Sequence, residues 1–342
     1  MSFGAVLGKL VAGDALSPDE VRGAFDAIFA GAWTPVQVGA FALALRMRGE
    51  SAETIVAAAE AMRSAMTVVD HGLDHVVDTC GTGGDGASSV NISSAAAIVV
   101  AACGYSVAKH GNRSVSSRCG SADVVEALGI PIDVAPSRQA DVLREAKIAF
   151  LFAPAHHPAL KHAALARREL GTRTIFNALG PLANPARATH QLVGVYDDRL
   201  RAIAARALGE LGVVRAWVVR GEDGLDEVSP CAPTRVSELL ASGEVVERVV
   251  APEDFGVARS TRTSISGGDA RANADAIERI LDGRPEPARD AVVLNAAAAL
   301  VVASGDDPRG CAARARAALD GGAARGVLEQ WRRVVVRVRA ES

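Results

Sequence analysis

The sequence contains little lysine and no excess of positive charge. Lysine occurs at four of the 342 positions, so arginine supplies 33 of the 37 basic residues, against 40 acidic residues and a formal net charge of −3. Proteins whose main partner is nucleic acid need a basic surface that neutralises phosphates. The composition therefore argues against such a partner, and it makes any lysine beside other functional groups conspicuous.

Long apolar runs are also absent. The longest, residues 95–103 and 296–303, have roughly half of the ~20 residues that a membrane-spanning helix requires. The first eleven residues include Lys9 but lack the basic, apolar and small-residue segments of a secretory signal. We therefore expect no membrane helix and a cytoplasmic location.

The five cysteines do not indicate a disulfide framework or a zinc site. Their number is odd and no two are closely spaced, whereas both kinds of site use paired cysteines. With 49% hydrophobic and 23% charged residues, the chain has the composition of a globular protein with one large or two modest domains.

The first seventy residues show helical signals only. Residues 17–20 (SPDE) form a capping box with proline at the first helical position, and residues 34–37 (TPVQ) repeat this device. A third helix is predicted over 52–66 from apolar residues at helical spacing. This segment is therefore predicted to be a small helical domain or subdomain.

From about residue 76, short β-branched runs alternate with helical stretches, which indicates a sheet with helices on its faces. Strands are predicted at 76–79, from 107, and at 131–134, 148–152, 192–196 and 215–219; helices are predicted at 93–103, 121–128, 138–146, 157–170, 200–211 and through most of the chain beyond 270. Residues 177–185 are too rich in helix breakers to be helical throughout, and they are predicted to cross between the helical part and the sheet.

A glycine-rich loop, residues 81–86 (GTGGDG), lies between the first predicted strand and the next helix. Closely spaced glycines let backbone N–H groups approach an anion, and the following helix N-terminus adds its positive end. The loop matches neither a Walker loop nor a good dinucleotide fingerprint. It is a candidate phosphate or pyrophosphate site, with a plain strand-to-helix turn as the alternative.

Polar residues at the start of the next helix favour the anion site. Asn91, Ser93 and Ser94 all lie there, although one short polar side chain is enough to cap a helix. Ser121, predicted to cap a later helix, is a further candidate anion contact.

A second polar cluster follows the next strand, where Lys109 stands beside His110, Asn112 and Arg113. Open α/β sheets bind ligands at the carboxyl ends of their strands. A solvated turn is the alternative for a short basic cluster, but the neighbouring glycine-rich loop favours an anion site.

Asp226 and Glu227 are adjacent carboxylates that follow a predicted strand. Such pairs suit magnesium, which commonly joins one or two protein carboxylates to substrate phosphates. An exposed acidic turn is the more common fate of such a pair, so the metal interpretation depends on the phosphate loop. Arg167 or Arg168 is a candidate clamp for a carboxylate.

Taken together, these motifs resemble the anthranilate phosphoribosyltransferase family of tryptophan biosynthesis. The resemblance runs through residues 78–86 (DTCGTGGDG), 91–94 (NISS), 109–116 (KHGNRSVS), 120–123 (GSAD), 157–158 (HP), 167 (R), 171–177 (GTRTIFN), 180–185 (GPLANP) and 226–230 (DEVSP). It covers essentially the whole chain. One departure is Ser94, where relatives usually have threonine, and the hydroxyl is retained.

The resemblance implies an α/β fold in which a small all-helical domain is hinged to a larger α/β domain with a central, mostly parallel sheet. Residues 1–70, with a helical contribution from about 160–190, would form the first domain, and residues 71–342 the second, which binds phosphoribosyl pyrophosphate (PRPP). It also implies a homodimer, and association with anthranilate synthase is a further expectation.

The resemblance assigns the substrates and Mg²⁺ to particular residues. Those expected to contact PRPP are Gly81, Gly84, Asp85, Ser89, Asn91, Ser93, Ser94, Lys109, Ser117 and Ser121. Magnesium would be held by Ser93, Asp226 and Glu227. Anthranilate would meet Gly81, Asn112 and Arg167, with His110 and His157 lining its approach.

The implied reaction transfers the phosphoribosyl group of PRPP to the amine of anthranilate. Loss of pyrophosphate from an anomeric carbon depends on magnesium and fixed N–H donors more than on a strong base, and the amine is already nucleophilic. No essential general base is therefore expected, although His110 could accept the amine proton late. The alternatives are a pyrimidine nucleoside phosphorylase, whose lysine-serine phosphate loop is absent, and a non-catalytic nucleic-acid-binding relative, which would lack the acidic pair.

Overall fold

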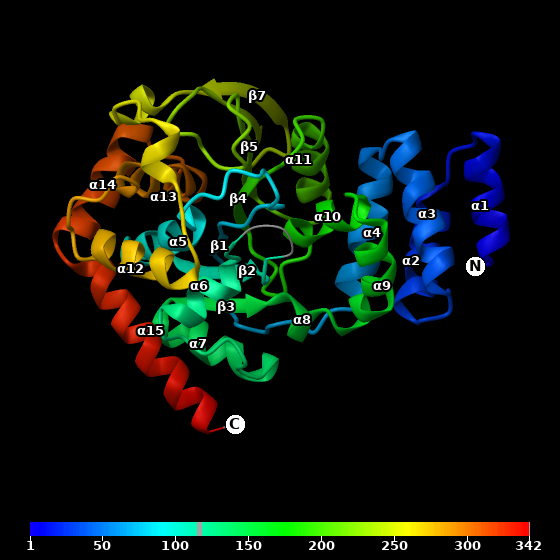
Figure 1. The fold of residues 1–342 in the computed structure, drawn as a ribbon, viewed down its shortest axis with the longest axis horizontal. Helices are drawn as coiled ribbons and strands as arrows, with labels where there is room; N and C mark the ends of the chain where they lie inside the picture. The colour runs from blue at the N-terminus through cyan, green and yellow to red at the C-terminus, as the bar shows by residue number, and fades with distance from the viewer. Residues whose placement is uncertain (115–117, 342) are drawn as a thin grey trace.

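The computed structural model describes residues 1–114 and 118–341, which form a helical part beside a larger α/β part (Figure 1). The helical part consists of α1 (Phe3–Ala12), α2 (Pro18–Phe29), α3 (Pro35–Arg48) and α4 (Ala52–Ser64), against which α9 (Lys161–Leu170) and α10 (Ile175–Leu179) pack. The predicted fold class is confirmed, while the exact domain boundaries and the hinge remain predictions.

The capping boxes predicted from the sequence begin α2 and α3. Ser17 and Thr34 each accept a hydrogen bond from the backbone N–H three residues on, and Glu20 and Gln37 accept the reciprocal bonds. Proline occupies the first helical position in both, where its missing N–H costs nothing. The interior of this part is aromatic, with Phe25 in contact with the rings of three other phenylalanines.

Within the described residues, the α/β part has one seven-stranded sheet in the order β3-β2-β1-β4-β5-β6-β7. Its strands are β1 (Val76–Asp78), β2 (Ser106–Gly111), β3 (Ile148–Phe152), β4 (His190–Gly194), β5 (Arg215–Gly221), β6 (Thr234–Leu239) and β7 (Val245–Val250). The first five are parallel, and β6 and β7 pair antiparallel at one edge. The carboxyl ends of β1, β2 and β4 therefore lie side by side.

Helices cover both faces of this sheet. They are α5 (Ile92–Ala102), α6 (Ser121–Ala127), α7 (Gln139–Ala146), α8 (Ala153–His156), α11 (Leu200–Glu210), α12 (Ala270–Leu281), α13 (Arg289–Ser304), α14 (Pro308–Asp320) and α15 (Ala323–Ala340). The alanine-rich helices α5 and α13 are almost wholly buried against each other. Small side chains on both helices permit this close approach.

Two strand predictions differ from the structure. Residues 131–134 form no strand, because Pro131 lacks a ladder donor, and Ile132 and Val134 instead fill the core beneath α15 and its neighbours. The strands β6 and β7 were not predicted, because charged residues interrupt their apolar pattern. In the described part of the chain the five cysteines are free thiols, and no helix has the length and apolarity to cross a membrane.

The breaker-rich segment 177–185 connects the two parts, as predicted. Asn184, which is 1% exposed, donates to Asp78 Oδ2 (2.7 Å) and to the carbonyl of Ala108 (2.8 Å), and its own oxygen accepts from Ala186 N (2.8 Å). From the helical part, Arg63 donates to the carbonyls of Leu182 (2.7 Å) and Leu211 (2.6 Å). The segment is thus fixed from both sides.

Replacing Asn184 with alanine should lower the free energy of unfolding by about 2–4 kcal/mol, because it removes the buried hydrogen bonds to Asp78 Oδ2, the Ala108 carbonyl and Ala186 N. Urea unfolding followed by circular dichroism measures this change. Asn177→Ala is the matched control: Asn177 only caps Thr174 N (3.0 Å), so about 1 kcal/mol is expected. Equal losses in the two variants would contradict the proposed role of Asn184.

Candidate functional site

The site is centred on Lys109, a lysine on β2 that is only 2% exposed. Its ammonium group donates to the carbonyl of Thr79 (2.6 Å) and to Ser93 Oγ (3.2 Å). Thr79 Oγ1 in turn donates to the carbonyl of Ser93 (3.0 Å). Burial lowers the pKa of Lys109, and the nearby Asp78 carboxyl opposes this shift. The ammonium group thus joins the ends of β1 and β2 to the first turn of α5.

Three carboxyl groups face this lysine across the ends of the strands. Glu227 Oε1 accepts from the backbone N–H of Ser93 (3.2 Å), and Asp226 N lies 3.4 Å from Asp85 Oδ2. Loss of solvation and the neighbouring carboxylates Asp85 and Glu227 raise the pKa of Asp226 well above its usual range, and loss of solvation raises the pKa of Glu227 to about 7. Burial and mutual repulsion therefore disfavour the charged forms of these carboxyl groups, and a bound cation would favour them.

This donor set fits magnesium. Carboxylate and hydroxyl oxygens are the ligands that the ion prefers, and the crowded carboxylates gain from a cation. Residues 1–114 and 118–341 contain no cluster of three or more His, Cys, Asp or Glu arranged as a complete metal site. Magnesium commonly takes one or two protein carboxylates and completes its shell with substrate phosphates and water.

The glycine-rich loop is held against β4 by close backbone contacts. Gly81 forms a parallel bridge with Gly194, and Thr82 N donates to the carbonyl of Gly194 (2.9 Å). A Cβ at position 194 would lie 1.6 Å from the carbonyl oxygen of Asp226, so only glycine is compatible with this approach. Gly84 has φ +80°, a conformation that favours glycine.

The polar residues before and within α5 are not used as a simple cap. Asn91 occupies the N-cap position without a capping hydrogen bond from its side chain, and its Oδ1 accepts from Asn273 Nδ2 (2.9 Å). The Ser94 hydroxyl is buried and has no hydrogen-bond partner within residues 1–114 and 118–341. Ser89 pairs with Ser266 in an isolated antiparallel bridge. The capping alternative therefore fails for Asn91.

Only some residues of the second polar cluster lie at the candidate site. Asn112 lies after β2, and its carbonyl accepts from Ser121 Oγ (3.3 Å). Ser121 is the first residue of α6 rather than its cap, because Gly120 holds that position and Asp123 accepts from Gly120 N (2.8 Å). Arg113 pairs with Asp123 and Glu126 at the surface, as in the solvated alternative. Ser117 lies outside the described residues.

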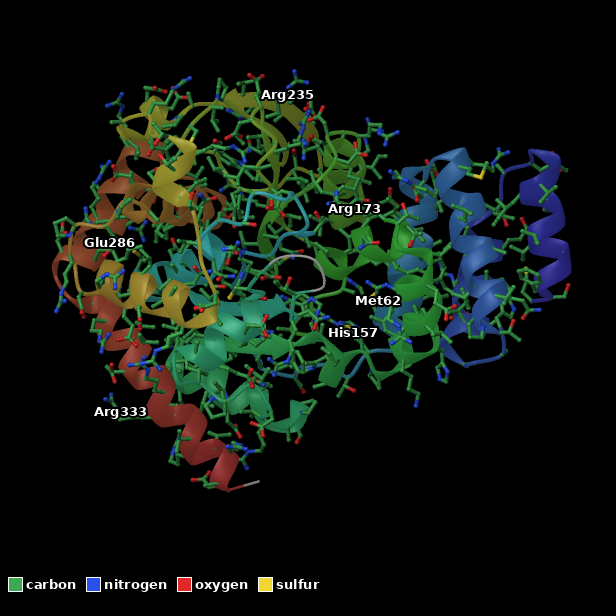
Figure 2. All side chains as sticks on the ribbon, in the orientation of Figure 1. Met62, His157, Arg173, Arg235, Glu286 and Arg333 are labelled. Carbon is green, nitrogen blue, oxygen red and sulfur yellow. The ribbon has the colours of Figure 1, made fainter. Side chains whose placement is uncertain are left out.

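Arg167 and two histidines lie where the helical part meets the α/β part, and His157 is labelled there in Figure 2. Arg167, half-buried on α9, lies over the ring of Phe176 (5.8 Å) and has no carboxylate partner among the described residues. His110 Nδ1 lies 3.1 Å from the carbonyl of Gly180, while its buried Nε2 has no partner, and its ring is 5.1 Å from that of His157. The site thus offers a cation on α9 without a carboxylate partner among the described residues, and a pair of neighbouring imidazoles.

Burial and the neighbouring imidazoles keep both rings uncharged at neutral pH. Burial, followed by the His157 and His156 charges, lowers the pKa of His110 well below its usual value. Burial, followed by the His156 charge, lowers the pKa of His157 to about 4. A neutral His110 that donates through Nδ1 keeps a lone pair on Nε2, so this atom can accept a proton.

Arg173 was missed as a site residue by the sequence analysis. Its guanidinium stacks on the ring of Tyr196 (4.0 Å), and a Cβ at Gly84 would lie 2.7 Å from it. Figure 2 places it beside the glycine-rich loop on the side of the helical part. Only tertiary contact reveals this position. The sequence signal that could have identified Arg173 is its place inside the motif of residues 171–177.

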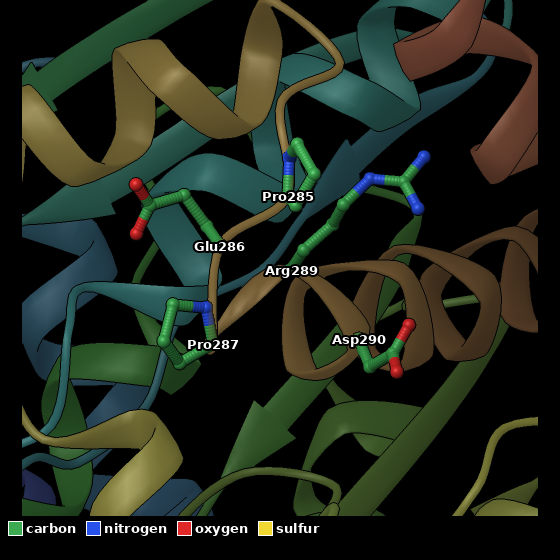
Figure 3. Close-up of a pocket in the computed structure, with 5 residues that line it drawn as sticks. All are labelled: Pro285, Glu286, Pro287, Arg289 and Asp290. Carbon is green, nitrogen blue, oxygen red and sulfur yellow. The ribbon is translucent and has the colours of Figure 1, made fainter.

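The concave surface of about 340 Å³ formed by Pro285, Glu286, Pro287, Arg289 and Asp290 contains none of the predicted site residues (Figure 3). It lies between α12 and α13. Glu286 is paired with Arg279, and Arg289 is paired with Asp320. Two of its charged side chains are therefore already paired, and none of its residues belongs to the candidate site.

Comparison with known proteins gives the same result over the whole chain. Residues 73–325 match the model described as "Glycosyl transferase family, a/b domain", and residues 5–66 match "Glycosyl transferase family, helical bundle domain". The anthranilate phosphoribosyltransferase of Myxococcus xanthus is 49% identical over 96% of this chain and 97% of the relative, and that of Symbiobacterium thermophilum is 48% identical over 99% of each.

Solved structures agree with these matches. The anthranilate phosphoribosyltransferase of Thermus thermophilus is 39% identical and superposes with a TM-score of 0.91 over 97% of this chain and 99% of that one. The enzyme of Saccharomyces cerevisiae in complex with PRPP and Mg is 26% identical, with a TM-score of 0.90 over 98% of each chain. The chain therefore belongs to this glycosyl transferase family, among the anthranilate phosphoribosyltransferases.

Proposed function

We propose that this protein transfers the phosphoribosyl group of PRPP to the amine of anthranilate, giving N-(5-phosphoribosyl)anthranilate and pyrophosphate in L-tryptophan biosynthesis. The observation that carries the proposal is the convergence of Lys109, the glycine-rich loop and the acidic pair at the ends of β1, β2 and β4. The S. cerevisiae relatives were solved with PRPP and Mg and with 4-fluoroanthranilate, which supports both substrates.

PRPP binds, in this proposal, along the glycine-rich loop and the start of α5. The contacting residues are Gly81, Gly84, Asp85, Ser89, Asn91, Ser93, Ser94, Lys109, Ser117 and Ser121. Ser93, Asp226 and Glu227 hold Mg²⁺, which when bound neutralises the charge of the pyrophosphate leaving group. The Ser94 hydroxyl, which has no partner among the described residues, and the crowding of Asp85, Asp226 and Glu227 support these assignments.

Anthranilate enters from the side of the helical part. Arg167, a cation without a protein carboxylate among the described residues, binds the substrate carboxylate, while Asn112 and Gly81 contact the remainder of the molecule. The neutral aniline amine attacks the anomeric carbon as pyrophosphate leaves. His110 Nε2, a buried acceptor without a partner, receives the amine proton after the new bond has formed, so no strong base is needed.

Purified protein should consume anthranilate only when both PRPP and Mg²⁺ are present, because the carboxylates bind the pyrophosphate through the ion. The fall in anthranilate fluorescence measures the reaction. The double variant Asp226→Asn, Glu227→Gln should lose PRPP binding in the presence of magnesium while keeping its circular dichroism spectrum. Phosphorolysis of thymidine or uridine without use of anthranilate would instead favour a nucleoside phosphorylase.

Arg167→Ala should raise the KM for anthranilate by about tenfold or more, as expected for a lost charge-assisted contact, while changing the KM for PRPP less than threefold. Arg168→Ala is the matched control, because Arg168 lies on the same helix but is exposed. Steady-state kinetics with each substrate varied in turn separates the effects. Equal changes in both KM values would argue against a carboxylate contact.

We further propose that the protein is a homodimer formed through an apolar face of the helical part. Val36, Leu43 and Met47 are 81%, 39% and 80% exposed and lie at spacings that place them on one side of α3. Val11 on α1 and Leu165 on α9 are also exposed, and both helices pack against α3. Exposed apolar residues that gather on neighbouring helices are typical of a protein interface.

The double variant Val36→Glu, Met47→Glu should elute as a monomer, because charges on this face oppose its burial, whereas the wild type elutes with twice the chain mass. Size-exclusion chromatography with light scattering measures both. Val249→Glu, at an exposed position on β7, is the control and should remain dimeric. A monomeric wild type would refute the proposal. A cytoplasmic location and association with anthranilate synthase remain predictions.

A further inference from the structure

The segment before α12 forms a brace across the end of the glycine-rich loop. Val90 N donates to the carbonyl of Ile265 (2.9 Å), and Gly267 N donates to the carbonyl of Ser88 (2.8 Å). A Cβ at position 267 would lie 2.5 Å from the carbonyl oxygen of Ser89. This close antiparallel contact brings the first turns of α12 beside Asn91.

The hydrogen bonds from this brace fix the orientation of two side-chain amides in turn. Gly268 N donates to Asn273 Oδ1 (2.7 Å). Because a backbone N–H can only donate, the oxygen of Asn273 must face it, and the Asn273 amino group must point the other way. That group donates to Asn91 Oδ1 (2.9 Å). The oxygen of Asn91 therefore faces Asn273, and the Asn91 amino group faces away from it.

A second donor reinforces this arrangement. The thiol of Cys119 lies 3.2 Å from the same oxygen of Asn91. Burial raises the pKa of Cys119 to about 11, so the thiol stays protonated and acts as a donor near neutral pH. The single thiol proton is also within reach of the Gly120 carbonyl, 3.4 Å from the sulfur. The Asn273 amino group is therefore the donor that fixes the Asn91 amide, whose own N–H groups point to the remaining side.

We propose that Asn273 is a positioning residue for PRPP binding: it orients the carboxamide of Asn91 so that the amino group, rather than the oxygen, faces the substrate. The proposal rests on the function proposed above, in which Asn91 contacts PRPP. The substrate presents phosphate, ether and hydroxyl oxygens, so a donor at this position binds it, whereas a carbonyl oxygen facing phosphate would repel it.

Asn273 itself is 2% exposed, and its amino group is bonded to Asn91, so in this proposal it acts through Asn91. It is also not required to begin α12, because Asp269 caps that helix by accepting from Ala272 N (2.9 Å). The two roles can therefore be separated by substitution. One residue starts the helix, and the other sets the orientation of a neighbouring amide.

Asn273→Asp is the sharpest test, because the side chain keeps its shape. One carboxylate oxygen still accepts from Gly268 N, but the other has no proton to give and faces Asn91 Oδ1, so the Asn91 amide turns over. We expect the Kd for PRPP, measured by calorimetry with Mg²⁺, to rise at least tenfold, while the KM for anthranilate changes less than twofold. Lowering the pH protonates the new carboxyl group, restores the donor and narrows the difference from wild type.

Asp269→Ala is the control for a general weakening of α12. It should lower the melting temperature without a comparable change in PRPP affinity. Asn273→Ala frees the Asn91 amide to rotate, so it should reduce PRPP affinity less than Asn273→Asp does. This variant replaces Asn273→Asp as the test if the aspartate variant fails to fold. A loss of PRPP affinity in Asp269→Ala equal to that of the Asn273 variants would overturn the positioning role.

The outcomes also separate this inference from the proposed function. A wild type that binds PRPP and consumes anthranilate, beside Asn273 variants of unchanged PRPP affinity, overturns the positioning role alone. A wild type that binds PRPP but does not use anthranilate contradicts the transfer reaction and leaves the affinity test decisive. A wild type without PRPP affinity overturns both.

Discussion

The buried ammonium group of Lys109 is the interaction on which the candidate site depends. Taking a charged amine out of water is costly unless it is hydrogen-bonded and faces opposite charge. Here the Thr79 carbonyl and the Ser93 hydroxyl accept from it, and Asp78, Glu227 and Asp226 supply negative charge. The lysine therefore fixes the ends of β1 and β2 and the start of α5 relative to one another, and the glycine-rich loop between β1 and α5 takes its position from both.

The sequence predicted correctly those helices that are determined by interactions between residues close together in the chain. The capping boxes at Ser17 and Thr34 specify α2 and α3 through hydrogen bonds within four residues, and both helices are present. Residues 131–134 were predicted wrongly because an apolar run reports burial, not pairing, and Pro131 cannot donate to a ladder. The pairing of β6 with β7 depends on the edge of the sheet, where polar residues are tolerated.

The same distinction holds within the site. Motifs that follow strand ends identified Lys109, Asp226 and Glu227, because parallel strands bring their carboxyl ends to one edge. Gly194 and Arg173 were not identified, since the close approach of the Asp226 carbonyl and the contact with Gly84 arise only when distant segments pack. Which residues bind PRPP and which bind anthranilate was inferred only from the family resemblance. Hydrogen-bonding side chains alone do not identify the ligand that they bind.

In the proposed function the acidic pair supplies only part of a metal site, and this would suit the reaction. Burial and the neighbouring carboxylates raise the pKa of Asp226 well above its usual range, so these groups would gain most from a bound cation. A magnesium ion held there would offer its remaining coordination sites to the pyrophosphate. The charge that leaves with pyrophosphate is then met by the ion and by Lys109. Because the strongest electrostatic groups act on the leaving group, the nucleophile needs little activation, and histidines kept neutral by burial are sufficient beside it.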